Sequence, residues 1–140
     1  MARPKQAKGD EVIVYDLSAR AVQAMTPVDL AGLDRPPDSP IGQFDFHGCS
    51  CGIASFSGRP PWELHEDGDE ILHILAGESK LTVLGKDGEV SRTLKPGDLV
   101  IVPKGCWHRS HSPKGVTLFH MTPRDGGRHS WEDPRAARSA

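Results

Sequence analysis

Two short segments of this sequence carry side chains of the types that bind metal ions. The first, WELHEDGDEILHILAGE, contains Glu63, His65 and Glu70, and the second, PKGCWHRSH, contains His108. Imidazole nitrogens bind Fe, Mn, Ni, Cu and Zn, whereas carboxylate oxygens shift the preference toward harder ions such as Mn and Fe(II). If the two segments meet in the fold, they predict one site for a divalent metal ion.

The spacing of these residues allows them to converge. Glu63 and His65 are two residues apart, so an extended chain points both side chains to the same side. Glu70 opens the next strand-like run, and a turn between two strands brings such side chains toward one point. His108 follows a third strand-like run, DLVIV, which ends in a Pro-x-Gly turn. The spacing within each segment thus allows a shared site, and it leaves open whether the two segments meet or form two separate polar loops.

Three further histidines lie near these segments. His73 comes three residues after Glu70, so a strand turns it to the opposite face. His111 is expected at the surface. Alternation alone does not decide whether His120 points inward, behind the candidate metal.

The sequence predicts that short strands position these residues. Seven runs are rich in β-branched and large apolar residues and alternate roughly with a period of two. They cover residues 11–17, 51–58, 70–77, 79–85, 89–94, 98–103 and 115–121. The KDG sequence at 86–88 predicts a hairpin turn. Only residues 18–33 have helical character, and Pro27 limits them to a short or irregular element. This pattern predicts an all-β sandwich or barrel.

The two segments resemble the paired motifs of the cupin superfamily, G-x5-H-x-H-x3–4-E-x6-G and G-x5-P-x-G-x2-H-x3-N. His65 stands at the second His of the first motif, and Glu70 and Gly77 match its end. The second motif is matched by Gly97, Pro103, Gly105 and His108. The resemblance covers about residues 58–112. It implies an all-β fold, the double-stranded β-helix or cupin jelly-roll barrel, in a single domain.

The sequence departs from these motifs at three positions. Glu63 stands at the first His, Ser112 stands at the final Asn, and four rather than five residues separate Gly58 from Glu63. Carried over by position, the resemblance implies one divalent ion (Fe, Mn, Ni or Zn) bound by Glu63, His65, Glu70 and His108. Because Glu63 differs in type, two roles stay open for it: a metal ligand, or a nearby catalytic general base.

The resemblance implies a metal-dependent enzyme that acts on a small organic molecule. Two His and one carboxylate with open positions form the ligand set of many non-haem Fe(II) oxygenases, so a dioxygenase is the simplest expectation. Cupins also include isomerases, decarboxylases and lyases, in which the ion acts as a Lewis acid. A third alternative is a module that binds a small molecule without catalysis, because a fold does not determine a function.

The composition describes a globular chain. Hydrophobic residues make up 36% of the 140 residues, and the formal net charge is −2. This charge gives no electrostatic reason to expect nucleic acid or a membrane surface as a partner. No apolar run approaches the ~20 residues of a membrane helix. The basic N-terminus is not followed by the apolar core of a secretory signal, so we expect a cytoplasmic protein.

The sequence divides into three segments. Residues 1–40 are expected to form an N-terminal strand and an irregular segment, residues 41–122 the barrel, and residues 123–140 a polar tail. Single-domain cupins commonly form homodimers by exchanging or adding N-terminal strands. The run at 11–17, EVIVYDL, is the candidate for a shared strand. The odd number of cysteines and the expected location predict free thiols.

Overall fold

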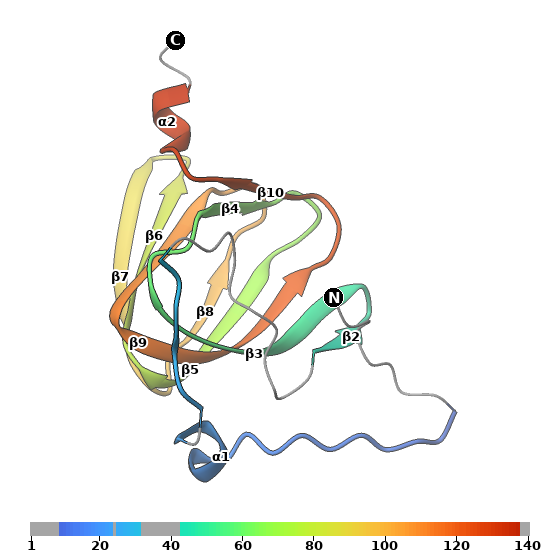
Figure 1. The fold of residues 1–140 in the computed structure, drawn as a ribbon. Helices are drawn as coiled ribbons and strands as arrows, with labels where there is room; N and C mark the ends of the chain where they lie inside the picture. Colours follow the sequence, from blue (N-terminus) through green and yellow to red (C-terminus); the bar gives the residue numbers. More distant parts are fainter. Residues whose placement is uncertain (1–8, 24, 32–42, 138–140) are drawn as a thin grey trace.

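The computed structural model describes residues 9–23, 25–31 and 43–137 (Figure 1). These residues form ten strands and two short helices. In chain order they are α1 (Ala19–Gln23), β1 (Val28–Asp29), β2 (Phe44–Phe46), β3 (Cys49–Gly58), β4 (Trp62–His65), β5 (Glu70–Gly77), β6 (Ser79–Gly85), β7 (Gly88–Leu94), β8 (Leu99–Val102), β9 (His108–Pro123), β10 (Gly127–Ser130) and α2 (Pro134–Ala137). Among the described residues, no helix is long and apolar enough to cross a membrane.

Six of the seven predicted strands are confirmed. The runs at 70–77 and 79–85 have the same bounds as β5 and β6, and the other four overlap β3, β7, β8 and β9. The hairpin predicted at 86–88 joins β6 to β7, which pair antiparallel and close at Gly85 and Gly88. Helix α1 is the short helix expected within 18–33. The three cysteines are free, as predicted.

Strand β9 joins the two layers of the structure. Its first part pairs antiparallel with β4 and β6, and its second part pairs antiparallel with β3 and β5. Strands β8, β7 and β10 extend these layers by pairing with β5, β6 and β4 respectively. The layers curl toward each other into a barrel (Figure 1). The all-β jelly-roll barrel predicted from the sequence is confirmed.

Alternate side chains of the strands fill the barrel. In β5, Leu72 and Ile74 point to the same side as Glu70, because side chains alternate along a strand. The buried apolar cluster consists of Leu30, Phe56, Leu72, Ile74, Leu81, Leu94, Val102, Val116 and Leu118. Full burial of one such side chain contributes about 1.5–3 kcal/mol. The inward-facing polar residues are therefore held by strands that the core fixes in place.

Gly77, the last residue of the first motif, lies where β5 passes close to β9. Its φ of +76° is a backbone conformation that favours glycine. A Cβ atom at this position would collide with the carbonyl oxygen of Gly115 and lie 2.9 Å from Cα of Val116. The motif thus requires glycine here for both conformation and space.

We predict that Gly77→Ala destabilises the protein by about 2–5 kcal/mol, the sum of left-handed strain and overpacking. Gly105 offers a matched control, because its φ is also +76° and no other described atom lies within 4 Å of an added Cβ. Gly105→Ala should carry the conformational cost alone, about 1–2 kcal/mol. Urea unfolding of both variants measures the difference. Equal losses of stability would contradict the close approach at Gly77.

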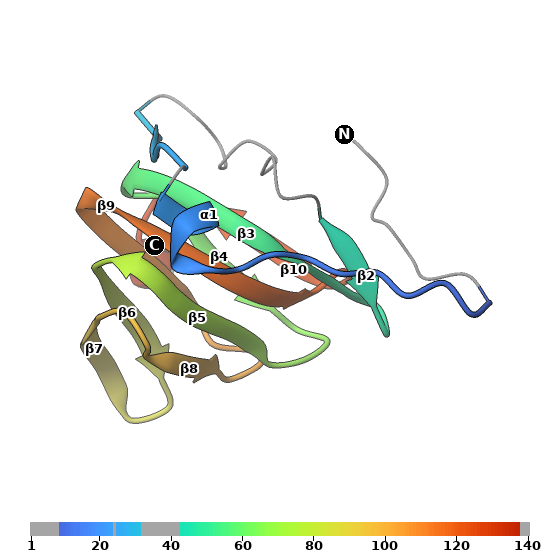
Figure 2. The same cartoon turned by 90° about the horizontal axis from the view of Figure 1, so that it is seen from below.

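The strand predicted at 11–17 is wrong for the structure described here. These residues have no strand assignment and are drawn as a plain tube in Figure 2. Tyr15 stacks on Phe44 with ring centroids 5.0 Å apart, whereas the side chains of Val12 and Val14 are 84% and 83% exposed. The segment contacts the barrel by side-chain stacking instead of strand pairing. The alternating pattern alone therefore gave a wrong prediction. Its role in a homodimer stays a prediction.

The residues after Pro123, predicted as a polar tail, contain strand β10. It pairs antiparallel with β4, with Gly127 opposite His65 and His129 opposite Glu63. The division of the chain into three segments otherwise stays a prediction. Its first boundary, at residues 40 and 41, lies outside the described residues, as do residues 138–140.

Candidate metal centre

Three strands deliver the four candidate ligands to one end of the barrel. Glu63 and His65 are alternate residues of β4, Glu70 is the first residue of β5, and His108 is the first residue of β9. The antiparallel pairing of β4 with β9 sets Glu63 opposite His108. All four residues predicted from the sequence are therefore brought together.

Two backbone contacts join the first motif to the second. The amide of Gly105 donates to the carbonyl oxygen of His65 at 2.8 Å, and the amide of Lys104 donates to Oδ1 of Asp69 at 2.9 Å. The positive φ of Gly105 belongs to the Pro-x-Gly turn that precedes His108. Asp69, which directly precedes β5, thus helps to anchor this turn.

The ligand atoms of the four side chains all lie within 4.8 Å of one another. Glu70 touches both imidazoles: its Oε2 is 3.4 Å from Nε2 of His65, and its Oε1 is 3.1 Å from Nε2 of His108. Oε2 of Glu63 lies 3.5 Å and 3.8 Å from the same two nitrogens. His65, Glu70 and His108 are buried, whereas the side chain of Glu63 is 29% exposed. Glu63 therefore closes the cluster on its solvent side.

The two imidazoles have the features expected of metal ligands. Nε2 of each is buried and makes no well-aligned hydrogen bond to any described residue. Nδ1 of His108 lies 3.1 Å from the carbonyl oxygen of Cys106, which can only accept, so Nδ1 carries the proton. This leaves the lone pair on Nε2 directed at the cluster. A metal-bound histidine usually donates its other ring N–H to a carbonyl or carboxylate in the same way. Buried polar atoms without partners are rare, and a divalent ion fits this donor set.

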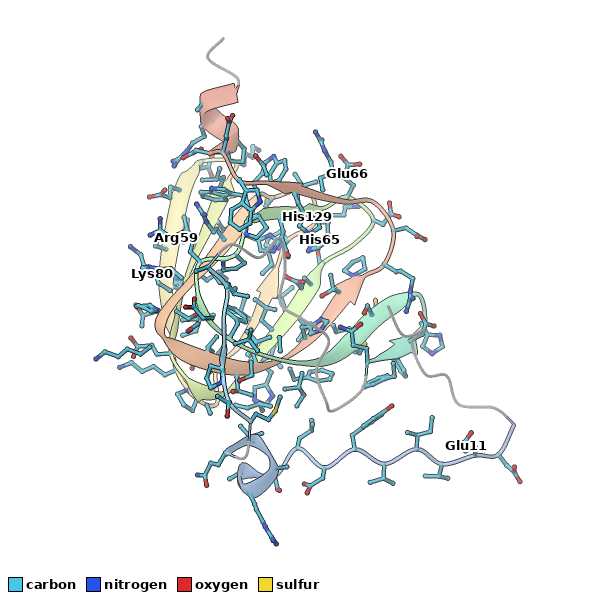
Figure 3. The ribbon with its side chains drawn as sticks, viewed as in Figure 1. Glu11, Arg59, His65, Glu66, Lys80 and His129 are labelled. Carbon is cyan, nitrogen blue, oxygen red and sulfur yellow. The ribbon has the colours of Figure 1, made fainter. Side chains whose placement is uncertain are left out.

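Two residues missed by the sequence analysis contact the carboxylates. Oγ1 of Thr122 donates to Oε2 of Glu70 at 2.6 Å. Nε2 of His129 lies 3.4 Å from Oε1 of Glu63, and Figure 3 labels His129 and His65 close together at the end of the barrel. His120, whose direction was undecided, bonds to Thr122 and therefore points inward.

Only the register between strands could have revealed the contact of Thr122 with Glu70. Thr122 comes two residues after His120 on β9, so its side chain lies on the same face. A correct register between β5 and β9 would have placed Thr122 beside Glu70. His129 had no such signal, because β10 consists of the polar sequence GRHS.

The charges of the cluster depend on one another. Burial opposes a positive charge on His65, but the nearby carboxylates of Glu63 and Glu70 outweigh burial and raise its pKa to about 9. Burial likewise opposes charge on His108, yet the carboxylate of Glu70 raises its pKa. Burial disfavours ionisation of Glu63, but His129 and His65 lower its pKa to about 2. Against the same burial effect, His108 and His65 lower the pKa of Glu70.

These pKa shifts apply to the site without a bound ion. The raised imidazole pKa values and the lowered carboxylate pKa values both favour protonated imidazoles beside ionised carboxylates. A divalent cation supplies the same positive charge, and its binding displaces the imidazole protons.

Comparison with known proteins finds similarity over the central part of the chain. Residues 56–121 match a family model described as a cupin domain. A 60-residue segment is 40% identical to the uncharacterized protein YdbB of Bacillus subtilis (strain 168), covering 43% of this chain and 50% of that protein. A 67-residue segment is 40% identical to an acireductone dioxygenase of Tuber melanosporum (strain Mel28), covering 44% and 38% respectively. The chain thus spans half or less of the length of these relatives.

Solved structures share the fold. Protein NMB1881 from Neisseria meningitidis superposes with a TM-score of 0.52 at 24% identity, over 67% of this chain and 91% of that one. An oxalate oxidase in complex with the substrate analogue glycolate gives a TM-score of 0.51 at 21% identity, over 59% and 46%. A cupin-2 domain containing protein from Shewanella frigidimarina gives 0.50 at 20% identity, over 68% and 88%. The two motifs, the barrel and the family model agree that residues 56–121 are similar to a cupin domain.

Proposed function

We propose that this protein is a metal-dependent dioxygenase that acts on a small organic molecule. The observation that carries the proposal is the convergence of two imidazoles and two carboxylates whose ligand atoms lie within 4.8 Å of one another. Two His and one carboxylate are the ligand set of many non-haem Fe(II) oxygenases. His65, Glu70 and His108 are the buried members and would hold the ion.

The ion would supply positions for substrate and O₂ together with redox and Lewis-acid chemistry. The protein itself excludes water from the site and orients the ligands. His65, Glu70 and His108 are almost fully excluded from water, which strengthens their interactions with a charged centre. Nδ1–H of His108 is held on the carbonyl of Cys106, so the ring is fixed in the orientation that presents Nε2.

Glu63 is the member of the cluster that can meet a substrate. Its carboxylate is partly exposed, and His129 approaches its outer oxygen while His65 approaches its inner one. In this place it can complete the ligand set or accept a proton from the substrate through Oε2. As a ligand it would also add negative charge and disfavour anionic substrates.

The similarity to acireductone dioxygenase supports an oxidative reaction and suggests which substrates to examine first. The similar segment covers 44% of this chain. An acireductone is an enediol, and the proton of such a substrate is one that a carboxylate beside a metal can accept. We therefore propose enediols and related enolisable carbonyl compounds as the substrate class.

Oxygen consumption tests the proposal. Protein loaded with Fe(II) under anaerobic conditions is mixed with a panel of enediol, enolisable and thiol compounds, and O₂ uptake is followed with an electrode. We expect uptake in step with product formation for at least one enediol. No uptake from any compound at full iron loading would overturn the dioxygenase proposal.

Two other results would point to the alternative functions. Turnover without O₂ would identify a non-oxidative isomerase, decarboxylase or lyase. Saturable binding of a compound without any turnover would identify a binding module. His108→Ala serves as the control in each assay, because it removes one buried donor of the cluster.

A further inference from the structure

A hydrogen-bonded chain lies behind the candidate metal centre. It starts at His120 on β9, passes through Thr122 on the same strand and ends at Glu70 on β5. Nδ1 of His120 is 2.9 Å from Oγ1 of Thr122, and Oγ1 of Thr122 is 2.6 Å from Oε2 of Glu70. His120 and Thr122 are alternate residues of β9, so both face the interior with Glu70.

The direction of each hydrogen bond follows from the number of protons available. The ionised carboxylate of Glu70 has acceptors only, so the hydroxyl proton of Thr122 must point to it. Oγ1 of Thr122 then has no proton left for His120. Nδ1 of His120 is therefore the protonated nitrogen and donates to Thr122.

This chain constrains the carboxylate that contacts both imidazoles. A short hydrogen bond to an ionised carboxylate is charge-assisted, and such bonds are roughly twice as strong as neutral ones. The bond fixes Oε2 of Glu70 on the side of Thr122 and leaves Oε1 directed at His108, 3.1 Å away. Without it, the carboxylate can rotate away from the position where its oxygens face both His65 and His108.

We propose that Thr122 is a positioning residue that holds Glu70 in its ligand orientation and that His120 orders the hydroxyl of Thr122. This inference rests on the proposed metal site. Neither residue belongs to the group of potential ligands among the described residues. Their function is to raise the affinity for the ion by fixing Glu70 before the ion binds.

Metal affinity tests the inference without any assay of activity. Thr122→Val keeps the shape of the side chain and removes the hydroxyl, so we expect the Kd for Co(II) and Zn(II) to rise by ~10–100-fold, the usual effect of outer-layer changes. Thr122→Ser restores the hydroxyl and should bring the Kd back to near the wild-type value. Competition with a chromophoric chelator gives these constants.

Thr117→Val is the matched control. Thr117 is buried on the same strand, and its hydroxyl hydrogen-bonds to Ser55 at 2.8 Å instead of to a carboxylate. This variant also loses a side-chain hydrogen bond of a buried threonine on β9 but should leave the Kd for both ions unchanged. Urea unfolding of the metal-free variants shows whether both changes affect the fold equally.

The tautomer of His120 gives a second readout. The ¹⁵N chemical shifts of the ring should report a protonated Nδ1 in the wild type and a change in Thr122→Val.

Each outcome can be assigned. Equal Kd values for Thr122→Val and the wild type, or an equal weakening in Thr117→Val, would overturn this inference while leaving the metal site standing. A wild-type protein that binds neither ion would overturn the metal site itself and the inference with it.

Discussion

Replacing His108 with alanine should remove stoichiometric metal from the protein. The variant loses one of two buried imidazole donors and leaves Glu70 with a single imidazole contact. Outer-layer changes already weaken metal sites by ~10–100-fold, so loss of a direct ligand should exceed this range. Elemental analysis of the purified proteins, followed by chelator competition, measures the effect.

His111→Ala is the control for this result. His111 lies three residues along the same strand and opposite Lys80, outside the group of potential ligands. Its replacement should leave the metal content unchanged. If His108→Ala retains one ion per chain with wild-type affinity, the site described here is not where the metal binds.

Glu63→Gln in the same series distinguishes the two roles of Glu63. A ligand role predicts weaker binding of the ion. A general-base role predicts unchanged metal content with a loss of turnover.

The stability of the metal-free protein should decrease between pH 6.5 and pH 9. The folded state raises the pKa of His65 to about 9, above the unfolded value of 6.5. A raised pKa contributes stability that is fully present below pH 6.5 and is lost as pH rises through the folded value. His108, whose pKa is also raised, acts in the same direction.

The carboxylates have the opposite dependence. The pKa of Glu63 is lowered from 4.5 to about 2, so its contribution is present above pH 4.5 and is lost as pH falls toward 2. Glu70 acts in the same direction, because its pKa is also lowered. The cluster therefore stabilises the metal-free fold most between about pH 4.5 and 6.5, a window set by these shifts.

Urea unfolding of chelator-treated protein at pH 5.5, 7.5 and 9.5 measures this dependence. Protein with excess metal provides an internal contrast, because an ion binds deprotonated imidazoles and its stabilising effect grows as pH rises. A metal-free profile that is flat or rises from pH 6.5 to 9 would show that the imidazoles do not bind protons as the geometry indicates.

The candidate site was predicted from the sequence because each of its two motifs is a local signal and the resemblance to paired cupin motifs implied that they meet. Glu63 and His65 are two residues apart, and His108 follows a turn marked by Pro103 and Gly105. Such spacings depend on chain geometry over a few residues. The same holds for β5 and β6, whose alternating pattern gave the correct bounds.

The remaining parts of the site depend on contacts between distant residues. Thr122 reaches Glu70 only because β9 pairs with β5 in one particular register, and His129 reaches Glu63 only because β10 completes the edge of β4. The sequence of β10 contains no apolar alternation. Conversely, residues 11–17 alternate well but have Tyr15 stacked on Phe44 instead of a paired strand. Alternation predicts where a strand can form and does not identify its partner.

Two backbone amides connect the motifs: Gly105 donates to His65, and Lys104 donates to Asp69. These hydrogen bonds have a consequence for the uptake of the ion. They use main-chain groups and a turn carboxylate that do not take part in binding the ion. The arrangement of the four donors is thus assembled by the fold itself, and preorganisation of this kind reduces the entropy lost on binding. Uptake of an ion then requires only the loss of its hydration water and of the imidazole protons. An ion stripped during purification could therefore be returned to the folded chain directly, with no refolding step.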